Sequence, residues 1–215
     1  MRRMTAEKKH PITQEEANIS PTIEDAERFL LTLPAQVLLE PLAHPLITTS
    51  YLLSAALHKH QKRAGGEPYF THPLAVCRTL CEIDAGVDAE MIAAALLHDT
   101  VEDCGITTEE IAEKITGKVA TMVDGLTKVN IENSTNGDAG KTFEKFLVFA
   151  RKDPRLYFIK FSDLIHNLDT LQHLSEEKQE RYAKGVLVKY APLARSIKQD
   201  KIAEILERKA KKWVR

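Results

Sequence analysis

The stretch that decides the fold is Met91–Asp103, MIAAALLHDTVED. Its first half, Met91–Leu97, is an unbroken apolar run, and its second half is dominated by ionisable residues. An apolar run bounded by polar residues and free of Gly and Pro is typical of a buried helix. We expect that helix to begin after Asp88, which can cap it, and to reach about Val101. The polar groups would then emerge from its buried end.

Four ionisable side chains would crowd this helix end. On a continuous helix His98 and Glu102 share one face, as do Asp99 and Asp103. Like charges this close are unfavourable unless a cation neutralises them. The simpler alternative is a capped and solvated helix end. The surrounding sequence decides between the two readings.

Apolar residues elsewhere recur at spacings of three and four, which predicts an all-α fold. A capping box is expected at Thr107, and Thr71 is expected to cap its helix. The polar stretch 130–140, NIENSTNGDAG, is expected to form a long functional or mobile loop. The remaining helices are predicted over residues 22–33, 35–41, 46–62, 71–83, 107–115, 118–126, 141–152, 155–172, 176–190 and 192–212.

Composition limits the class of protein. Among 215 residues, 30 Lys plus Arg balance 31 Asp plus Glu, and the net charge is −1. This balance excludes a generally basic nucleic-acid-binding surface. No apolar run approaches the ~20 residues that span a bilayer, and the polar start lacks a secretory signal. Three cysteines are too few for a disulfide framework. We expect a cytoplasmic enzyme or regulator without nucleic-acid or membrane partners, and a single domain over 21–215 behind a flexible tail, 1–20.

A second group of polar residues lies on the predicted helix 155–172. Lys160, Asp163, Asn167 and Thr170 form one stripe of an otherwise apolar helix. A carboxylate in such a helix must be paired or coordinating. His166 is expected to pack within the helix. Asp163 joins a mixed set of imidazole and carboxylate groups that suits Mn²⁺, Fe²⁺ or Zn²⁺, and the other members are His72, His98 and Asp99.

Four stretches in unbroken order resemble the hydrolase domain of RelA/SpoT homologues, within the HD phosphohydrolase superfamily. They are HKHQKRAGGEPYFTHPLAV, AALLHDTVEDCGIT, VDGLTKV and DPRLYFIKFSDLIHNLDTL, inside residues 46–197. The resemblance implies an all-α HD fold. It also implies a stringent-response enzyme that hydrolyses the 3′-pyrophosphate of (p)ppGpp to GDP or GTP and pyrophosphate. A hydrolase-only chain, similar to metazoan SpoT homologues, is expected.

The resemblance also implies roles for individual residues. One divalent metal, with Mn²⁺ as the expected ion, would be held by His72, His98, Asp99 and Asp163. The catalytic acidic pair would be Glu102 and Asp103. The nucleotide would meet Arg63, Asn167 and Thr170. Phosphate contacts are expected from Lys62 and Lys160, with Lys128 a weaker candidate.

The chain departs from the family pattern where relatives carry basic residues, because it has Ala64, Leu164 and Asp169 there. This loss of positive charge keeps other substrates open. One alternative is the 2′-phosphate of NADPH, and another is an adenosine alarmone. A third alternative is a different function, that of a module that senses a nucleotide without turnover. The presence of Glu102 and Asp103 favours an enzyme, since binding alone does not require them.

Overall fold

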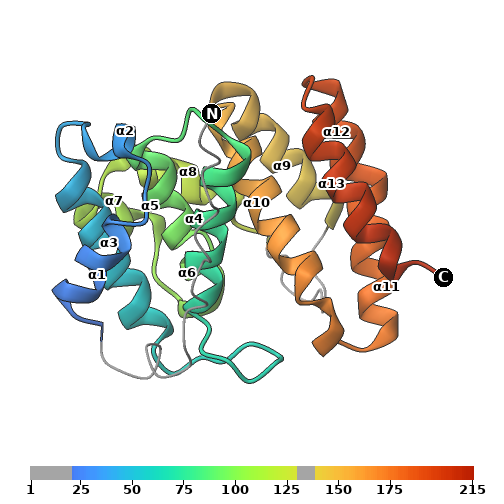
Figure 1. Ribbon diagram of the computed structural model, residues 1–215, viewed down its shortest axis with the longest axis horizontal. Coiled ribbons are helices and arrows are strands. Elements are labelled where there is room, and N and C mark those ends of the chain that lie inside the picture. The colour runs from blue at the N-terminus through green and yellow to red at the C-terminus, as the bar shows by residue number, and fades with distance from the viewer. Residues whose placement is uncertain (1–20, 130–138) are drawn as a thin grey trace, which may run out of the picture.

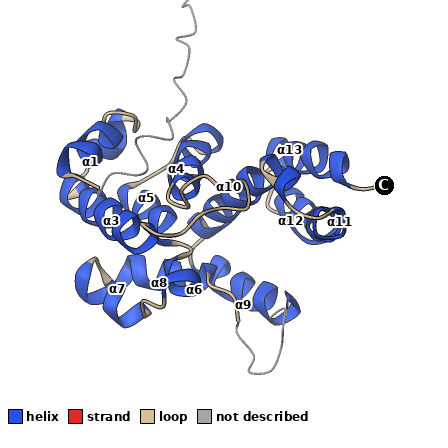
Figure 2. Ribbon diagram, turned by 90° about the horizontal axis from the view of Figure 1, so that it is seen from below, coloured by secondary structure: helices blue, strands red, loops and turns tan. Residues whose placement is uncertain are grey.

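The computed structural model describes residues 21–129 and 139–215, and these residues form helices without a strand (Figure 2). A single isolated bridge, between Lys62 and Pro68, closes a loop. The helices are α1 (Ile23–Leu30), α2 (Ala35–Leu38), α3 (Ala43–His58), α4 (Thr71–Ile83), α5 (Ala89–Leu97), α6 (Thr100–Cys104), α7 (Thr108–Lys114), α8 (Gly117–Leu126), α9 (Ala139–Lys152), α10 (Arg155–Asp169), η1 (Leu171–His173), α11 (Glu176–Gly185), η2 (Val186–Tyr190), α12 (Ala191–Ser196), α13 (Asp200–Ala210) and η3 (Lys211–Trp213).

Helix α5 is the centre of the core. Every residue of α5 except Glu90 is buried, as its apolar run predicts. It packs against α3, α4, α8 and α10. The expected cap is confirmed, because the Asp88 side chain accepts a hydrogen bond from the Met91 amide. The core therefore fixes the position of the residues that follow α5.

Helix α10 joins the two sides of the molecule. Figure 1 shows α1–α8 gathered on one side and α11–α13 on the other, with α10 between them. Helix α10 packs against α4 and also against α13. At its far end the indole N–H of Trp213 donates to the Leu168 carbonyl oxygen at 3.1 Å. The C-terminal segment is thereby anchored to α10.

The break after α5 corrects the prediction of a continuous helix to Val101. Helix α5 ends at Leu97, and α6 begins at Thr100. The His98 ring donates to the Ala95 carbonyl, and the Thr100 hydroxyl donates to the Leu97 carbonyl. Such side-chain bonds compete with the helical backbone pattern. His98 and Asp99 therefore lie in a turn, but Asp99 and Asp103 still share a face, because the Asp103 amide donates to the Asp99 carbonyl oxygen and Tyr69 contacts both carboxylates.

The other predicted boundaries vary in accuracy. The Thr107 capping box is confirmed, whereas Thr71 is not a cap, because its hydroxyl donates to Pro68. Helix α3 starts and ends earlier than the predicted 46–62. The segment 176–196 has no break at 190, because the π-helical turn η2 joins α11 to α12; the break lies before α13 instead.

Two predictions fall partly or wholly outside the described residues. The tail 1–20 lies outside them, as does 130–138 of the expected loop, whereas Ala139 and Gly140 belong to α9. Within the described part of the chain, no helix has the length and apolar character needed to cross a membrane.

Candidate metal centre and active site

A cavity of about 360 Å³ lies among α4, the α5–α6 turn, α8 and α10. All of the site residues predicted from the sequence line this cavity, although they come from segments far apart in the chain. The lining set is Lys62, Arg63, His72, His98, Asp99, Glu102, Asp103, Lys160, Asp163, Asn167 and Thr170.

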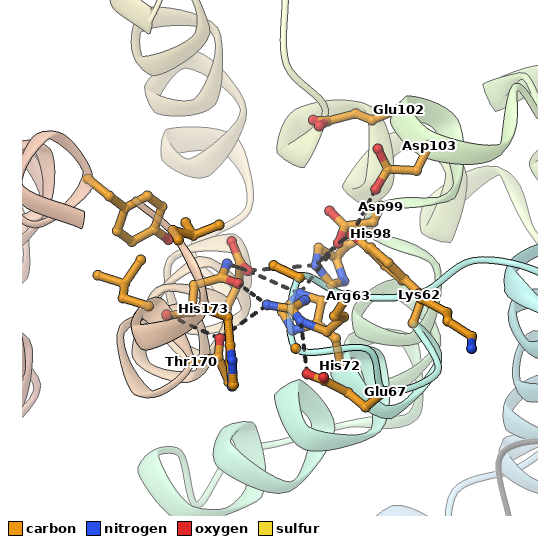
Figure 3. Close-up of a pocket in the computed structure, with 18 of the residues that line it drawn as sticks. Lys62, Arg63, Glu67, His72, His98, Asp99, Glu102, Asp103, Thr170 and His173 are labelled. Atoms are coloured by element: carbon orange, nitrogen blue, oxygen red, sulfur yellow. Dashed lines mark hydrogen bonds and ion pairs between the residues drawn. The ribbon is translucent and has the colours of Figure 1, made fainter. Parts of the chain in front are cut away.

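Two imidazoles and a carboxylate converge on the floor of the cavity (Figure 3). The Nε2 atoms of His72 and His98 lie 3.4 and 3.1 Å from Asp99 Oδ2. Both histidines are buried, and ligand atoms from all three residues lie within 4.8 Å of one another. These groups have the spacing of a metal-binding cluster.

Asp163 completes the cluster from α10. Its Oδ1 atom lies 3.4 Å from His72 Nε2 and 3.8 Å from His98 Nε2. Ligand atoms about 2.1 Å from a metal lie roughly 3.0–3.4 Å apart at octahedral to tetrahedral angles. Most separations in the cluster fall in or close to that range. Asp163 thus lies next to both imidazoles, whereas the group whose ligand atoms all lie within 4.8 Å of one another is His72, His98 and Asp99.

The hydrogen-bond geometry of His98 also suits a metal ligand. Its Nδ1–H donates to the Ala95 carbonyl oxygen at 2.8 Å, which leaves Nε2 with a lone pair in the neutral ring. This buried Nε2 has no hydrogen-bond partner. A buried polar atom without a partner is costly unless something else satisfies it. A divalent cation coordinated by nitrogen and oxygen ligands would do so.

The charges of the cluster call for a cation. Burial would raise the pKa of Asp99, but the imidazoles of His98 and His72 hold this pKa well below its usual range. Burial would likewise raise the pKa of Asp163, yet the Lys160 ammonium and both imidazoles lower it. Against the effect of burial, the two carboxylates raise the pKa of His98 to about 9. The carboxylates of Asp99 and Asp163 thus both face the two imidazoles.

His166 has a position that the helix-packing prediction missed. Its Nδ1 atom lies 2.8 Å from His72 Nδ1, on the side of that ring opposite the cluster. Burial and the nearby charges of His72 and Arg63 lower the pKa of His166 to about 3, so the ring is neutral at pH 7. The two residues are 94 positions apart, so helical spacing alone could not reveal the pair.

The acidic pair lies beside the cluster but outside it (Figure 3). Glu102 accepts hydrogen bonds from the backbone N–H and the ammonium of Lys128, both at 2.5 Å. The phenol oxygen of Tyr69 lies 2.7 Å from a carboxylate oxygen of Asp103 and 2.7 Å from Asp99 Oδ2. Tyr69 therefore connects the metal cluster to the acidic pair. Its place three residues before His72 is the signal that could have identified it.

Arg63 links the loop between α3 and α4 to α10. Its Nη2 group donates to Asn167 Oδ1 at 2.8 Å and to Thr170 Oγ1 at 3.2 Å. The guanidinium also lies 5.6 Å from the centroid of the Tyr69 ring. Asn167 in turn donates to Asp163 Oδ1 at 2.5 Å. The three residues predicted to meet the nucleotide form one connected wall of the cavity.

The two predicted phosphate lysines differ in their availability. Lys62 is exposed, and Figure 3 shows its side chain extending away from the His72–Asp99 cluster. The ammonium of Lys160 donates to Asp163 Oδ2 at 2.8 Å. Lys160 thus neutralises a candidate metal ligand. Lys128, the weaker candidate, has a side chain that is 65% exposed at the cavity, so its ammonium is accessible to an anion.

The positions that lack basic residues do not all face the cavity. Leu164 is buried in the core, and Asp169 pairs with Lys209 of α13. Neither lines the cavity, whereas Ala64 does. The loss of a basic residue at position 164 therefore removes no charge from the cavity, because that side chain is packed among apolar residues.

Comparison with known proteins identifies the family and several relatives. A family model described as HD domain matches residues 50–197. A GTP pyrophosphokinase of Streptomyces coelicolor is 39% identical over 161 residues, which are 75% of this chain and 19% of that protein. A guanosine-3′,5′-bis(diphosphate) 3′-pyrophosphohydrolase of Aquifex aeolicus is 40% identical over 148 residues, 69% of this chain and 21% of its own length. The chain thus spans about a fifth of these relatives.

The fold is also similar to that of a solved structure. A metazoan orthologue of SpoT described as hydrolysing ppGpp superimposes with a TM-score of 0.58 at 23% identity. The match covers 76% of this chain and 90% of that one. The helical fold, the converging histidines and carboxylates and the family match over more than half of the residues agree. The chain belongs to the HD domain family.

Proposed function

We propose that this protein is a metal-dependent hydrolase that removes the 3′-pyrophosphate of guanosine 3′,5′-bis(diphosphate) and its pentaphosphate analogue. The observation that carries the proposal is the cluster of His72, His98, Asp99 and Asp163 on the floor of a cavity, with His98 Nε2 lacking a partner. The Aquifex aeolicus relative is named for this reaction. Mn²⁺ is the ion that we propose.

The nucleotide end of the substrate would lie against Arg63, Asn167 and Thr170. These side chains are already connected by hydrogen bonds, so little reorganisation is needed to form the wall. The planar guanidinium of Arg63 suits both stacking on a base and binding of phosphate. This arrangement would direct the ribose phosphates towards the cluster.

The phosphate end would meet positive charge at Lys128, which lies at the cavity edge. Its ammonium is paired with Glu102. A substrate phosphate would compete for that ammonium. Release of Glu102 from the pair would leave its carboxylate able to orient water or accept a proton.

A divalent metal, when bound, would polarise a phosphoryl oxygen and lower the pKa of water. The residues of the chain itself place the carboxylates of Asp103 and Glu102 beside the proposed metal site. A hydrogen bond from the Tyr69 hydroxyl holds Asp103 in place. Tyr69 keeps its proton, because burial and the neighbouring carboxylates raise its pKa well above the usual range. It therefore acts as a hydrogen-bond donor.

The test is a substrate panel with purified protein and added Mn²⁺, comparing ppGpp, pppGpp, ppApp and NADPH with identification of the products. We expect pyrophosphate with GDP or GTP from the guanosine alarmones, and no turnover after chelation. Release of inorganic phosphate from NADPH as the preferred reaction would replace the proposed substrate. Nucleotide binding without any turnover would support the sensing module instead.

One observation keeps NADPH, which has a single phosphate at the ribose 2′ position, as the second candidate. At the cavity wall, Ala64 stands where the family pattern has a basic residue. Less positive charge favours a substrate with fewer phosphates near that wall. The same panel ranks these substrates by kcat/KM.

A further inference from the structure

His166 and His72 form a pair of imidazoles whose hydrogen bond has a direction. The two Nδ1 atoms lie 2.8 Å apart, and the ring centroids lie 4.8 Å apart. Two N–H groups cannot bond to each other, so one Nδ1 carries the hydrogen and the other accepts it. His72 is buried, and water has little access to replace this partner.

Metal coordination through Nε2 would fix which nitrogen of His72 carries the hydrogen. Its other nitrogen, Nε2, lies 3.4 Å from both Asp99 Oδ2 and Asp163 Oδ1. A neutral imidazole carries one hydrogen, and a nitrogen that binds a metal must be free of it. Coordination through Nε2 therefore requires the hydrogen on Nδ1. His166 Nδ1 must then be the acceptor.

We propose that His166 is a positioning residue that holds His72 in the Nδ1–H form and so presents Nε2 to the metal. This inference rests on the proposed metal site. Hydrogen bonds of this kind to the second nitrogen orient metal-binding histidines and raise their basicity.

Comparison of the two histidine ligands within this chain supports the assignment. His98 has the same arrangement, with Nδ1 donating to a carbonyl oxygen, that of Ala95, at 2.8 Å. Both imidazoles thus have their remote nitrogen held at 2.8 Å while Nε2 faces the carboxylates. The partner of His98 is backbone and cannot be removed by substitution. The partner of His72 is a side chain and can be.

The test measures the affinity for Mn²⁺ alone, without nucleotide, in wild type and three variants. His166→Phe keeps a ring but has no acceptor, and we expect it to weaken Mn²⁺ binding by about 10- to 100-fold. His166→Asn offers an amide oxygen as acceptor and should recover most of the loss. His44→Phe is the matched control, because His44 is exposed on α3 and does not line the cavity. Circular dichroism monitors the fold of each variant.

A second measurement needs no variant. In the Zn²⁺-loaded wild type, nitrogen-15 spectra should assign the shared hydrogen to His72 Nδ1 and a bare Nδ1 to His166. A hydrogen on His166 Nδ1 would overturn the inference, as would equal Mn²⁺ affinity of wild type and His166→Phe. If the wild type binds no divalent metal, the proposed metal site itself fails, which is a separate result.

Discussion

Asp163 uses both of its oxygen atoms. Oδ1 faces the two Nε2 atoms and accepts from Asn167, while Oδ2 accepts from the Lys160 ammonium. Because the carboxylate is buried, only these partners, and the proposed cation when it is bound, can satisfy its charge. The proposed metal site can therefore be tested by removing the negative charge of this one carboxylate.

Replacing Asp163 by Asn should therefore abolish metal binding and turnover, since a neutral amide binds a divalent ion more weakly. Metal content by mass spectrometry and activity test this expectation, and circular dichroism should show the helical fold retained. Asp169→Asn is the matched control, because Asp169 lies on the same helix, half exposed and away from the cavity. Full metal content in the Asp163 variant would refute the ligand assignment.

Glu102 tests the chemistry separately from the metal. It lies outside the cluster and pairs with Lys128. Glu102→Gln should keep metal content and KM near wild type but reduce kcat by ~10²-fold or more, because an amide cannot take a proton. Glu109→Gln, exposed on α7, is the control. Wild-type turnover of the Glu102 variant would leave this residue a structural role only.

At the scale of elements, the loop between α3 and α4 depends on Arg63 for its attachment to α10. Arg63→Ala should raise KM with little change in metal content, because stacking and charge-assisted bonds worth about 1–3 kcal/mol, or about 5- to 150-fold, are lost. Steady-state kinetics measure this. Arg78→Ala, exposed on α4, is the control. An unchanged KM would remove Arg63 from the binding wall.

The end of α6 depends on one glycine. Gly105 has φ +73°, in the left-handed region, and a Cβ there would meet nothing within 4 Å. Gly105→Ala should therefore lower the free energy of unfolding by about 1–2 kcal/mol through backbone strain alone. Gly117 also has open space around it but no positive φ, so Gly117→Ala is the control. Urea unfolding that ranks the two variants equally would contradict this account.

Individual elements show what the sequence could predict. The apolar run and Asp88 gave the start and burial of α5, because both are local signals. The break at His98 was missed, since side-chain bonds to the Ala95 and Leu97 carbonyls caused it rather than a Gly or Pro. The η2 turn was missed for a similar reason, because a π-helical turn keeps the helical pattern while adding a residue. The sequence therefore predicted that these segments are helical, but it did not predict where each helix ends.

The candidate site was predictable only in part. Spacing and family resemblance together selected residues that do line one cavity. The contacts of Lys128 and Tyr69 follow from folding, which brings residues from separate segments together. Helical periodicity cannot predict such contacts, because it relates only residues that are a few positions apart in the sequence.

At the scale of the whole molecule, the cluster unites three separate parts of the chain. His72 comes from α4, His98 and Asp99 from the turn before α6, and Asp163 from α10. An ion bound by all of them would bind the folded state and not the unfolded chain. Mn²⁺ at ~100 times its Kd should therefore raise the free energy of unfolding by about 2.7 kcal/mol.

Thermal unfolding followed by circular dichroism, with and without Mn²⁺, measures this gain, and a chelator should reverse it. Asp163→Asn should show a much smaller response. An equal response of this variant would mean that the ion stabilises the protein from another site.

The contact between Trp213 and α10 makes the C-terminal segment separately observable. The chain has one tryptophan, and its indole N–H is bound to the Leu168 carbonyl oxygen. Selectively excited fluorescence consequently comes from a single place, the junction of η3 with α10, whereas circular dichroism averages over every helix. Superimposable denaturation curves from the two methods would mean that both sides of the molecule unfold in one cooperative step. An earlier fluorescence change would show the C-terminal helices detaching while the α5 core stays intact.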